Sequence, residues 1–341
     1  MRALLSYILT RILLTIPMIF ILLTLVFFII RVMPGDPVKS MLGAHAPKET
    51  MDEVRHQLGL DKPIIDFSTN NQFVDYMSAF FHGDLGQSLW YRVPVTEKIA
   101  QYFPATLELS FFALLFAVVF GVATGAFAAH KRKSAADYSI RLFGITSYSI
   151  PVFWLGLMLQ MIFGVAFDWF PIAGRIGARV SPQVITGLYV VDGIITLNFE
   201  QVASALWHLV LPSTALGLIL CGIFIRLTRA NMLGVLKQDY VLAANARGIP
   251  KRRVVYKHAL KNAFVPILTM MGLEFAYLMS GAVLTETTFS WPGMGSFLVE
   301  SVNYRDFPAL QGTIIFIALL VMGISLLVDI LYAIIDPRVR Y

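Results

Sequence analysis

The stretch LSFFALLFAVVFGVATGAFAAH, residues 109–130, contains no Asp, Glu, Lys or Arg. Its 22 residues exceed the roughly 20 that an α-helix needs to cross about 30 Å of hydrocarbon. Similar runs, free of charge except for Glu274, lie at residues 12–30, 142–167, 201–225, 262–285 and 307–328. The pattern predicts an all-α, polytopic membrane protein with six transmembrane helices. We interpret the shorter uncharged run at 180–191 as part of a loop.

The composition of the whole chain supports this fold class. Of its 341 residues, 57% are hydrophobic and only 14% are charged, whereas about 25% of residues are charged in soluble domains. This balance excludes a disordered chain, a nucleic-acid-binding tail and an ordinary cytosolic enzyme. The single cysteine, Cys221, lies in an apolar run and is expected to be a packing residue rather than a redox site.

The distribution of charge predicts the orientation of the helices. If the N-terminus is cytoplasmic, the cytoplasmic segments carry 17 basic and four acidic residues, against 10 basic and 16 acidic residues on the other side. Basic residues concentrate in cytoplasmic loops. Both termini are therefore expected to be cytoplasmic, in a multi-pass protein of the plasma (inner) membrane.

Three regions follow from the spans and their connections. Residues 1–31 form the first transmembrane helix, residues 32–103 an extracytoplasmic segment, and residues 104–341 a five-helix core. Helical spacing of apolar residues predicts short helices at 48–59 and 73–81 within the extracytoplasmic segment. This segment is either a small cap that packs on the membrane surface or a docking surface for an extracytoplasmic partner, and the two interpretations are compatible.

A second aromatic feature lies in the outer connection at residues 286–306. It reads Phe289-Ser290-Trp291-Pro292-Gly293-Met294-Gly295. Two interpretations fit these residues, an interfacial aromatic anchor and a re-entrant turn. We favour the anchor, because tryptophan and tyrosine concentrate at membrane–water interfaces.

The cytoplasmic connection at residues 239–262 is predicted to form two short helices that meet at a tight corner. Asp239 is a suitable N-cap, Gly248 suits the left-handed position that ends a helix, and Pro250 suits the first turn of the next one. The first helix carries small side chains and one cation on a single face: Ala243, Ala244 and Arg247. Such a face allows close approach of another protein. The alternative is a basic amphipathic loop on anionic lipid.

Motifs for chemistry are missing from the sequence. It contains no G-x-x-x-x-G-K-[ST] loop for ATP and no H-E-x-x-H site, and its six histidines lack metal-ligand spacing. We therefore expect no catalytic residue, no metal site and no cofactor in this chain. Glu274 is the one acidic residue inside a span. Because intramembrane acids are costly and often functional, it is a candidate for the translocation path; the alternative is a neutral side chain hydrogen-bonded to a neighbouring helix.

At the cytoplasmic corner the chain resembles the permease subunits of ABC importers, and more narrowly the first of the two permeases of dipeptide and oligopeptide importers. The corner matches the family's coupling motif with Ala243, Ala244 and Gly248, followed by His258, Asn262 and Pro266. Leu242 stands where many members carry glutamate. Further matches occur in order at residues 33–37 (MPGDP), 83–86 (GDLG), 106–109 (TLEL), 148–151 (YSIP), 289–293 (FSWPG) and 336–338 (DPR).

The resemblance implies partners and a set of coupling residues. It implies a second homologous permease, two cytoplasmic ATPase subunits or domains that bind ATP and Mg²⁺, and an extracytoplasmic binding protein. We predict that this binding protein docks on residues 32–103 and 168–206. Membrane lipid surrounds the chain. The residues implied in ATPase coupling are Asp239, Ala243, Ala244, Arg247, Gly248, His258 and Asn262.

Other functions remain open at this stage. Related permeases serve nickel complexes or oligosaccharides instead of peptides. A stand-alone channel or secondary transporter is the alternative from another class, and it would need intramembrane polar sites, of which Glu274 is the only acidic candidate. An intramembrane protease would use a serine such as Ser325, which lacks a convincing histidine partner.

Overall fold

A computed structural model describes residues 2–32, 38, 46–57, 61–65 and 70–335. Within these residues every regular element is a helix, and an isolated bridge joins Gln87 to Pro94. Two of the motifs quoted above, at 33–37 and 336–338, lie outside the described residues. The prediction of an all-α chain is confirmed for the part that the structure describes.

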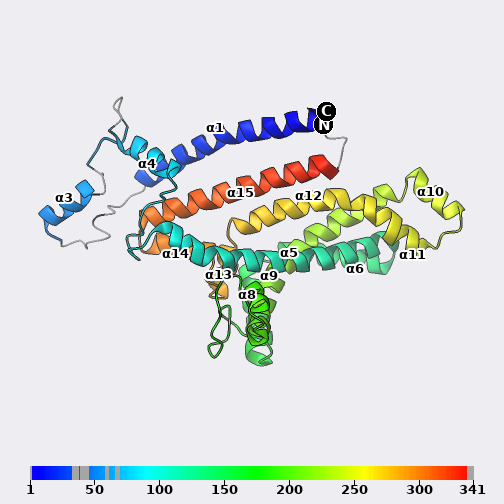
Figure 1. Cartoon of the computed structure of the whole chain (residues 1–341). Coiled ribbons are helices and arrows are strands. Elements are labelled where there is room, and N and C mark those ends of the chain that lie inside the picture. Colours follow the sequence, from blue (N-terminus) through cyan, green and yellow to red (C-terminus); the bar gives the residue numbers. More distant parts are fainter. Residues whose placement is uncertain (1, 33–37, 39–45, 58–60, 66–69, 336–341) are drawn as a thin grey trace.

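Five helical segments are long and apolar enough to cross a membrane. They are α1 (Arg2–Val32), α5 (Val95–His130), α9 (Phe199–Val235), α15 (Phe307–Ile335) and the unbroken segment Lys251–Met279, which comprises α11 (Lys251–Arg253), η2 (Val254–Ala259) and α12 (Leu260–Met279). In Figure 1, α1, α15 and α12 run side by side between an end that carries α4 and an end that carries α10. We call these the α4 end and the α10 end.

The sixth candidate span is bent. Helix α6 (Ala135–Ser149) is followed by α7 (Val152–Leu159) and η1 (Gln160–Ala166), and the two halves meet at 102°. At the junction, Ile150 has an extended backbone (φ −80°, ψ 130°), as expected of a residue that precedes a proline. The uncharged run at 142–167 was predicted as one span. The structure counts six spans only if this bent pair is a single span, because Pro151 interrupts the helix.

Helices α5 and α9 form the centre of the bundle and pack closely along their length. Small residues recur every four positions on the buried face of α5: Ala113, Ala117, Gly121 and Gly125. A β-carbon at Gly125 would lie 2.8 Å from the carbonyl oxygen of Ile225 on α9. In a bilayer, the hydrophobic effect does not drive helices together, because lipid tails are as apolar as the side chains. Small residues instead let the backbones approach closely, so that van der Waals packing stabilises the helix pair.

Helix α1 lies against α15 at the edge of the bundle. Near the α10 end, Arg11 forms an ion pair with Asp329 (3.2 Å). Towards the α4 end, Leu23 and Val26 pack with Phe307 and Ile315. The first turn of α1 and the last turn of α15 therefore lie at the same end of the molecule, on the side of the bundle that carries α10 (Figure 1).

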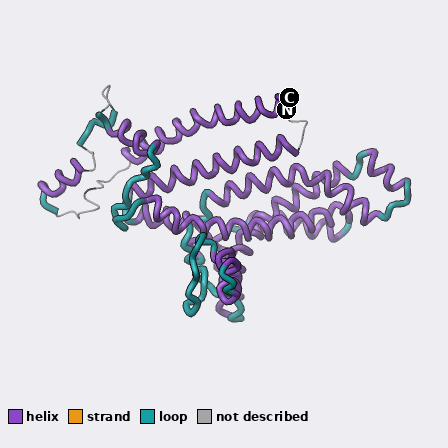
Figure 2. The backbone as a smooth tube through the Cα atoms, viewed as in Figure 1, coloured by secondary structure: helices purple, strands orange, loops and turns teal. Residues whose placement is uncertain are grey.

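The connections between the spans contain short helices. They are α3 (Lys48–Gln57), α4 (Gln72–Phe81), α8 (Tyr189–Ile195), α13 (Val283–Thr288) and α14 (Met294–Asn303). The helices expected at 48–59 and 73–81 are confirmed within a few residues, and Phe27 of α1 contacts Phe73 and Tyr76 of α4. Figure 2 shows loops next to α8. The loop expected at 180–191 ends at Leu188, because α8 begins at Tyr189.

Candidate functional site

The α10 corner, defined here as residues 239–262, is built by a local turn. Helix α10 (Asp239–Ala246) ends with Gly248 at φ +73°. The N–H of Gly248 donates to the Asn245 carbonyl (3.0 Å), and that of Ile249 donates to the Ala244 carbonyl (3.2 Å). This is the Schellman pattern, which uses a left-handed residue to satisfy the last carbonyls of a helix. The left-handed conformation predicted for Gly248 is confirmed.

Two details of the corner differ from the sequence-based prediction. The N-cap of α10 is Gln238, and Asp239 is the first helical residue. At this position its negative charge still interacts favourably with the positive end of the helix dipole. The second helix is not a separate short one. Pro250 is the N-cap of α11, and the helical backbone continues through η2 and α12 to Met279 because nothing after Arg253 breaks it.

Contacts hold α10 on one side and leave its other side exposed. Val241 is 1% exposed and packs inward, and Asn262 Nδ2 donates a 2.7 Å hydrogen bond to Tyr240 Oη. The sequence-based reasoning did not single out Tyr240. Leu242 is 58% exposed. Among the predicted coupling residues, five are exposed, namely Asp239, Ala243, Arg247, Gly248 and Asn262. The remaining two, Ala244 and His258, are half-buried.

The electrostatic character of the α10 corner is basic. Its residues include one acid, Asp239, and six bases: Arg247, Lys251, Arg252, Arg253, Lys257 and Lys261. The corner therefore presents an exposed patch of small and apolar side chains within a positive field. It is suited to a protein surface that has a groove and acidic groups around it, or to anionic lipid.

Glu274 lies away from the corner, further along the same helical segment. Its residue is only 9% exposed. It shares a face of α12 with Ile267 and Leu278, which pack in the main core cluster together with residues of α5 and α9. The side chain therefore faces protein rather than lipid. Whether this position lines a path for substrate stays a prediction.

A buried ion pair, which the sequence analysis missed, joins α5 to a distant loop. Arg175 Nη2 lies 2.8 Å from Glu108 Oε2, with the two side chains 5% and 3% exposed. Glu108 Oε1 accepts from the Val190 N–H (2.8 Å), and Arg175 Nη2 also donates to the Gly187 carbonyl (3.0 Å). The guanidinium lies 3.9 Å from the centre of the Tyr189 ring. These contacts tie the α8 region to α5.

Asp192 organises the loop on which that ion pair depends. Its carboxylate accepts from the N–H groups of Ile185, Thr186 and Gly187 and from the Thr186 hydroxyl. Burial opposes ionisation of Asp192, but the hydrogen bonds outweigh it and hold its pKa below the ordinary value. A carboxylate that gathers successive N–H groups fixes the loop backbone.

A third buried carboxylate joins α5 to the turn between α13 and α14. Glu286 accepts from the Thr106 hydroxyl (2.7 Å) and from the Ser296 N–H (2.9 Å), and burial raises the pKa of its carboxyl. Trp291 is fully buried and donates from Nε1 to the Ala105 carbonyl (2.9 Å). The interpretation of Phe289–Gly295 as an interfacial anchor is therefore wrong, because these aromatic rings fill the core. We refer to Glu108, Arg175, Asp192 and Glu286 together as the Glu108 cluster.

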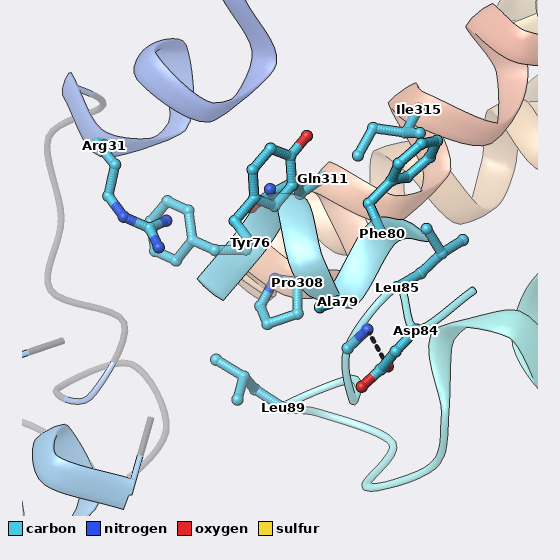
Figure 3. Close-up of a pocket in the computed structure, with 12 residues that line it drawn as sticks. Arg31, Tyr76, Ala79, Phe80, Asp84, Leu85, Leu89, Pro308, Gln311 and Ile315 are labelled. Atoms are coloured by element: carbon cyan, nitrogen blue, oxygen red, sulfur yellow. Dashed lines mark hydrogen bonds between the residues drawn. The ribbon is translucent and has the colours of Figure 1, made fainter. Parts of the chain in front are cut away.

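A small pocket at the α4 end joins three helices. Its volume is about 190 Å³. Figure 3 shows Arg31 entering from α1, Tyr76 and Phe80 from α4, and Pro308 and Gln311 from α15. Ligand pockets commonly measure about 300–1,000 Å³. The pocket is therefore a junction between helices rather than a site that could enclose a substrate.

Comparisons with known proteins cover nearly the whole chain. Residues 121–341 match the family described as "Binding-protein-dependent transport system inner membrane component", and residues 4–110 match the N-terminal region of the same kind of component. The chain is 42% identical to a dipeptide transport system permease protein of Alkalihalophilus pseudofirmus, over 99% of this chain and 100% of that protein.

Two further relatives carry related descriptions. A di/tripeptide transport system permease protein of Pseudomonas aeruginosa is 42% identical, over 99% of each chain. A glutathione transport system permease protein of Escherichia coli is 37% identical, also over 99% of each chain. The similarity therefore extends through the α10 corner, Glu274 and the Glu108 cluster alike.

Proposed function

The chain belongs to the family of inner membrane components of binding-protein-dependent transport systems, and on that premise we propose that it is the permease subunit of an ATP-driven ABC importer of di- or oligopeptides. The observation that carries this proposal is the full-length similarity to relatives described as dipeptide, di/tripeptide and glutathione permeases. The chain is a multi-pass membrane protein and a transport component rather than an enzyme. Nickel-complex and oligosaccharide import are the alternatives to be tested against peptide import.

The proposed orientation places both termini and the α10 corner on the cytoplasmic side of the inner membrane. The first turn of α1 and the last turn of α15 lie at the α10 end (Figure 1). The basic residues of the corner lie there too, as does the Lys131–Lys133 tract that follows α5. The positive-inside tendency favours this arrangement.

The α10 corner is the proposed docking site for a cytoplasmic ATPase. Ala243 and Arg247 would contact the ATPase groove directly, since both are exposed, and Ala244 would limit how closely the helix sits. Gly248 sets the turn, and Asn262 holds α10 through Tyr240. Asp239 and His258 complete the set, at the first turn of α10 and on η2.

The continuous helical segment gives the corner a mechanical route into the membrane. Residues Lys251–Met279 form one helical segment of 29 residues, and Glu274 lies in its last turns. A displacement of α10 would be passed to α12 through the turn at Gly248 and the Asn262–Tyr240 hydrogen bond. In this proposal, the ATPase movement switches the path between inward and outward access.

The proposed complex contains three further kinds of subunit. A second homologous permease would form the other half of the path, two ATP-binding subunits or domains would hold ATP and Mg²⁺, and an extracytoplasmic binding protein would deliver the substrate. The binding protein is proposed to dock on the segments at 32–103 and 168–206. Of their described elements, α3 and α4 lie at the end remote from α10, and α8 projects from the bundle (Figure 1).

The test is purification of the tagged chain with its co-expressed partners. ATPase subunits should co-purify, and ATP hydrolysis should rise when the binding protein loaded with a dipeptide is added. Ala244→Asp should reduce both, because a charge would be placed against the ATPase groove. Stimulation by a nickel complex or an oligosaccharide instead would reject the peptide assignment. Absence of any ATPase subunit from the purified chain would reject the importer itself.

Glu274→Gln tests the proposed path separately. The substitution keeps the size of the side chain and removes its charge. Complex assembly and binding-protein docking should be preserved, while peptide uptake and its dependence on pH change. Uptake that is identical to wild type at every pH would remove Glu274 from the path.

A further inference from the structure

A groove between α6 and α9 combines a cationic end with an apolar floor. Its volume is about 350 Å³. Three arginines lie at one end, namely Arg141, Arg226 and Arg229, and the groove continues past Gly144, Ile145, Tyr148 and Gly222. This groove is separate from the α10 corner, from Glu274 and from the Glu108 cluster.

The three arginines are not equivalent. Arg229 is neutralised by Asp137, with two hydrogen bonds of 2.6 and 2.9 Å to the carboxylate. Arg141 and Arg226 are exposed, and the Asp137 carboxylate, whose hydrogen bonds go to Arg229, also attracts Arg141 electrostatically. Arg141 instead lies 5.8 Å from the centre of the Tyr138 ring. The groove therefore presents two exposed guanidinium groups to a ligand, of which Arg226 is the one that Asp137 does not influence.

The apolar part of the groove extends away from these cations along the two helices. Gly144 and Gly222 are buried where the two backbones meet, since a β-carbon at Gly222 would overlap the carbonyl oxygen of Gly144, and this contact forms the floor of the groove. Ile145 is 63% exposed on its rim. The groove thus accepts an apolar chain that follows the helices from an anionic group held at Arg141 and Arg226.

The level of the groove fits the edge of a membrane. Arg141 lies six residues after the start of α6 at Ala135, which is about 9 Å along the helix. The basic tract Lys131–Lys133 immediately precedes this helix. Basic pockets between transmembrane helices on the cytoplasmic side are suited to anionic lipid head groups.

We propose that this groove binds an anionic phospholipid, with its phosphate held by Arg141 and Arg226 and one acyl chain lying over Gly144 and Gly222. Charge complementarity selects the head group, and the apolar floor selects a molecule with a hydrocarbon tail. The lipid would cover the exposed side of α6 next to the bend at Pro151. A peptide or a soluble anion would leave the apolar floor exposed.

Photo-cross-linking in nanodiscs tests the proposal on the assembled transporter. The probe is phosphatidylglycerol with a photoreactive group on an acyl chain, diluted in phosphatidylcholine, and the cross-linked peptides are identified by mass spectrometry. Cross-links are expected on residues 144–148 and 222–226. If each arginine near the surface contributes about 1 kcal/mol, the Arg226→Gln variant should lose about fivefold in cross-linking and the Arg141→Gln/Arg226→Gln variant about 30-fold.

Matched controls separate the groove from general surface charge. Arg132→Gln removes one exposed positive charge from the adjoining loop and should leave the groove cross-links unchanged. Ile145→Trp should fill the groove and reduce cross-linking with both free arginines intact, whereas Leu142→Trp, on an exposed α6 position outside the groove, should not.

Two results would overturn the proposal. One is equal cross-linking of a phosphatidylcholine probe, which would show lipid contact without head-group selection. The other is cross-linking of a photoreactive residue at position 145 to the second permease instead of to lipid, which would show that protein covers the groove. Neither result depends on ATP hydrolysis or peptide uptake, so the outcome is independent of the proposed transport function.

Discussion

The α10 corner and the Glu108 cluster differ in how far their side chains are satisfied by contacts within this chain. In the cluster, Glu108 and Glu286 each use both carboxylate oxygens, and both side chains are buried. At the corner, a single side-chain hydrogen bond holds α10, while Leu242 and Ala243 face outward. The carboxylates of the first region find their partners within this chain, although Arg175 Nε is buried without one, whereas the second region has the form of a surface that another chain completes.

The largest expected effect comes from breaking the completed region. Arg175→Ala leaves the Glu108 carboxylate buried without its counter-ion, which should destabilise the fold by about 3–5 kcal/mol. The measurement is the thermal midpoint of the detergent-solubilised chain, together with its yield. Arg179→Ala, which removes an exposed arginine from the same loop, is the matched control and should have little effect. Equal midpoints for the two variants would contradict the role given to the ion pair.

A smaller effect on folding, but a large one on assembly, is expected at the corner. Gly248→Val forces a β-branched residue into φ +73°, at a cost of about 1–3 kcal/mol that the turn can relieve only by changing shape. Membrane insertion should be normal, and ATPase co-purification should fall. Gly234→Val is the control, because Gly234 is helical with open space around it. Normal ATPase binding by Gly248→Val would make the corner a lipid-facing basic loop.

Acid should weaken the contribution of Asp192 to the stability of the Glu108 cluster. The pKa of Asp192 is lowered in the folded state, so its contribution to stability is present above the unfolded pKa of about 3.9. It is lost as the pH falls below that value through the folded pKa. The thermal midpoint of wild type minus that of Asp192→Asn should therefore be positive at neutral pH and shrink on acidification. A difference that is constant with pH would contradict this assignment.

The smallest effect should come from the tether of α10. Asn262→Ala removes the hydrogen bond to Tyr240, which at an exposed position contributes about 0.5–1.5 kcal/mol. Hydrogen–deuterium exchange should increase in residues 239–246 and stay unchanged in α12. The Asn245→Ala variant, which alters an exposed position on α10 without touching this bond, should not show the increase. Unchanged exchange in Asn262→Ala would mean that Val241 alone holds the helix.

These two regions also mark how far the sequence could be interpreted. Local rules were sufficient to predict the conformation of Gly248. A glycine that follows an alanine-rich helix ends it through hydrogen bonds between backbone groups only a few residues apart. They were insufficient for Arg175, whose partner Glu108 is 67 residues away. Trp291 was assigned to the interface because an aromatic residue near a span end has the same pattern whether it faces head groups or core. The full burial of Trp291 and its hydrogen bond to the Ala105 carbonyl distinguish the two.

Errors in the helices have a similar origin. Apolar length predicts where a span exists, and it did so for each of the five unbroken segments. It carries no information about direction, so the bend at Pro151 and the continuation of α11 into α12 were missed. Both depend on which backbone hydrogen bonds survive at one or two residues, a property that hydropathy does not contain.

The bent pair of α6 and α7 has a consequence for biogenesis. A translocon selects segments by their apolar length and so would release residues 142–167 into the bilayer as it would any straight span. The 102° angle can then be completed only after α9 and α13 arrive to pack against α7, because backbone groups freed at a break need partners in hydrocarbon. Insertion of α6–α7 into the membrane would thus precede the packing that gives this segment its bent shape.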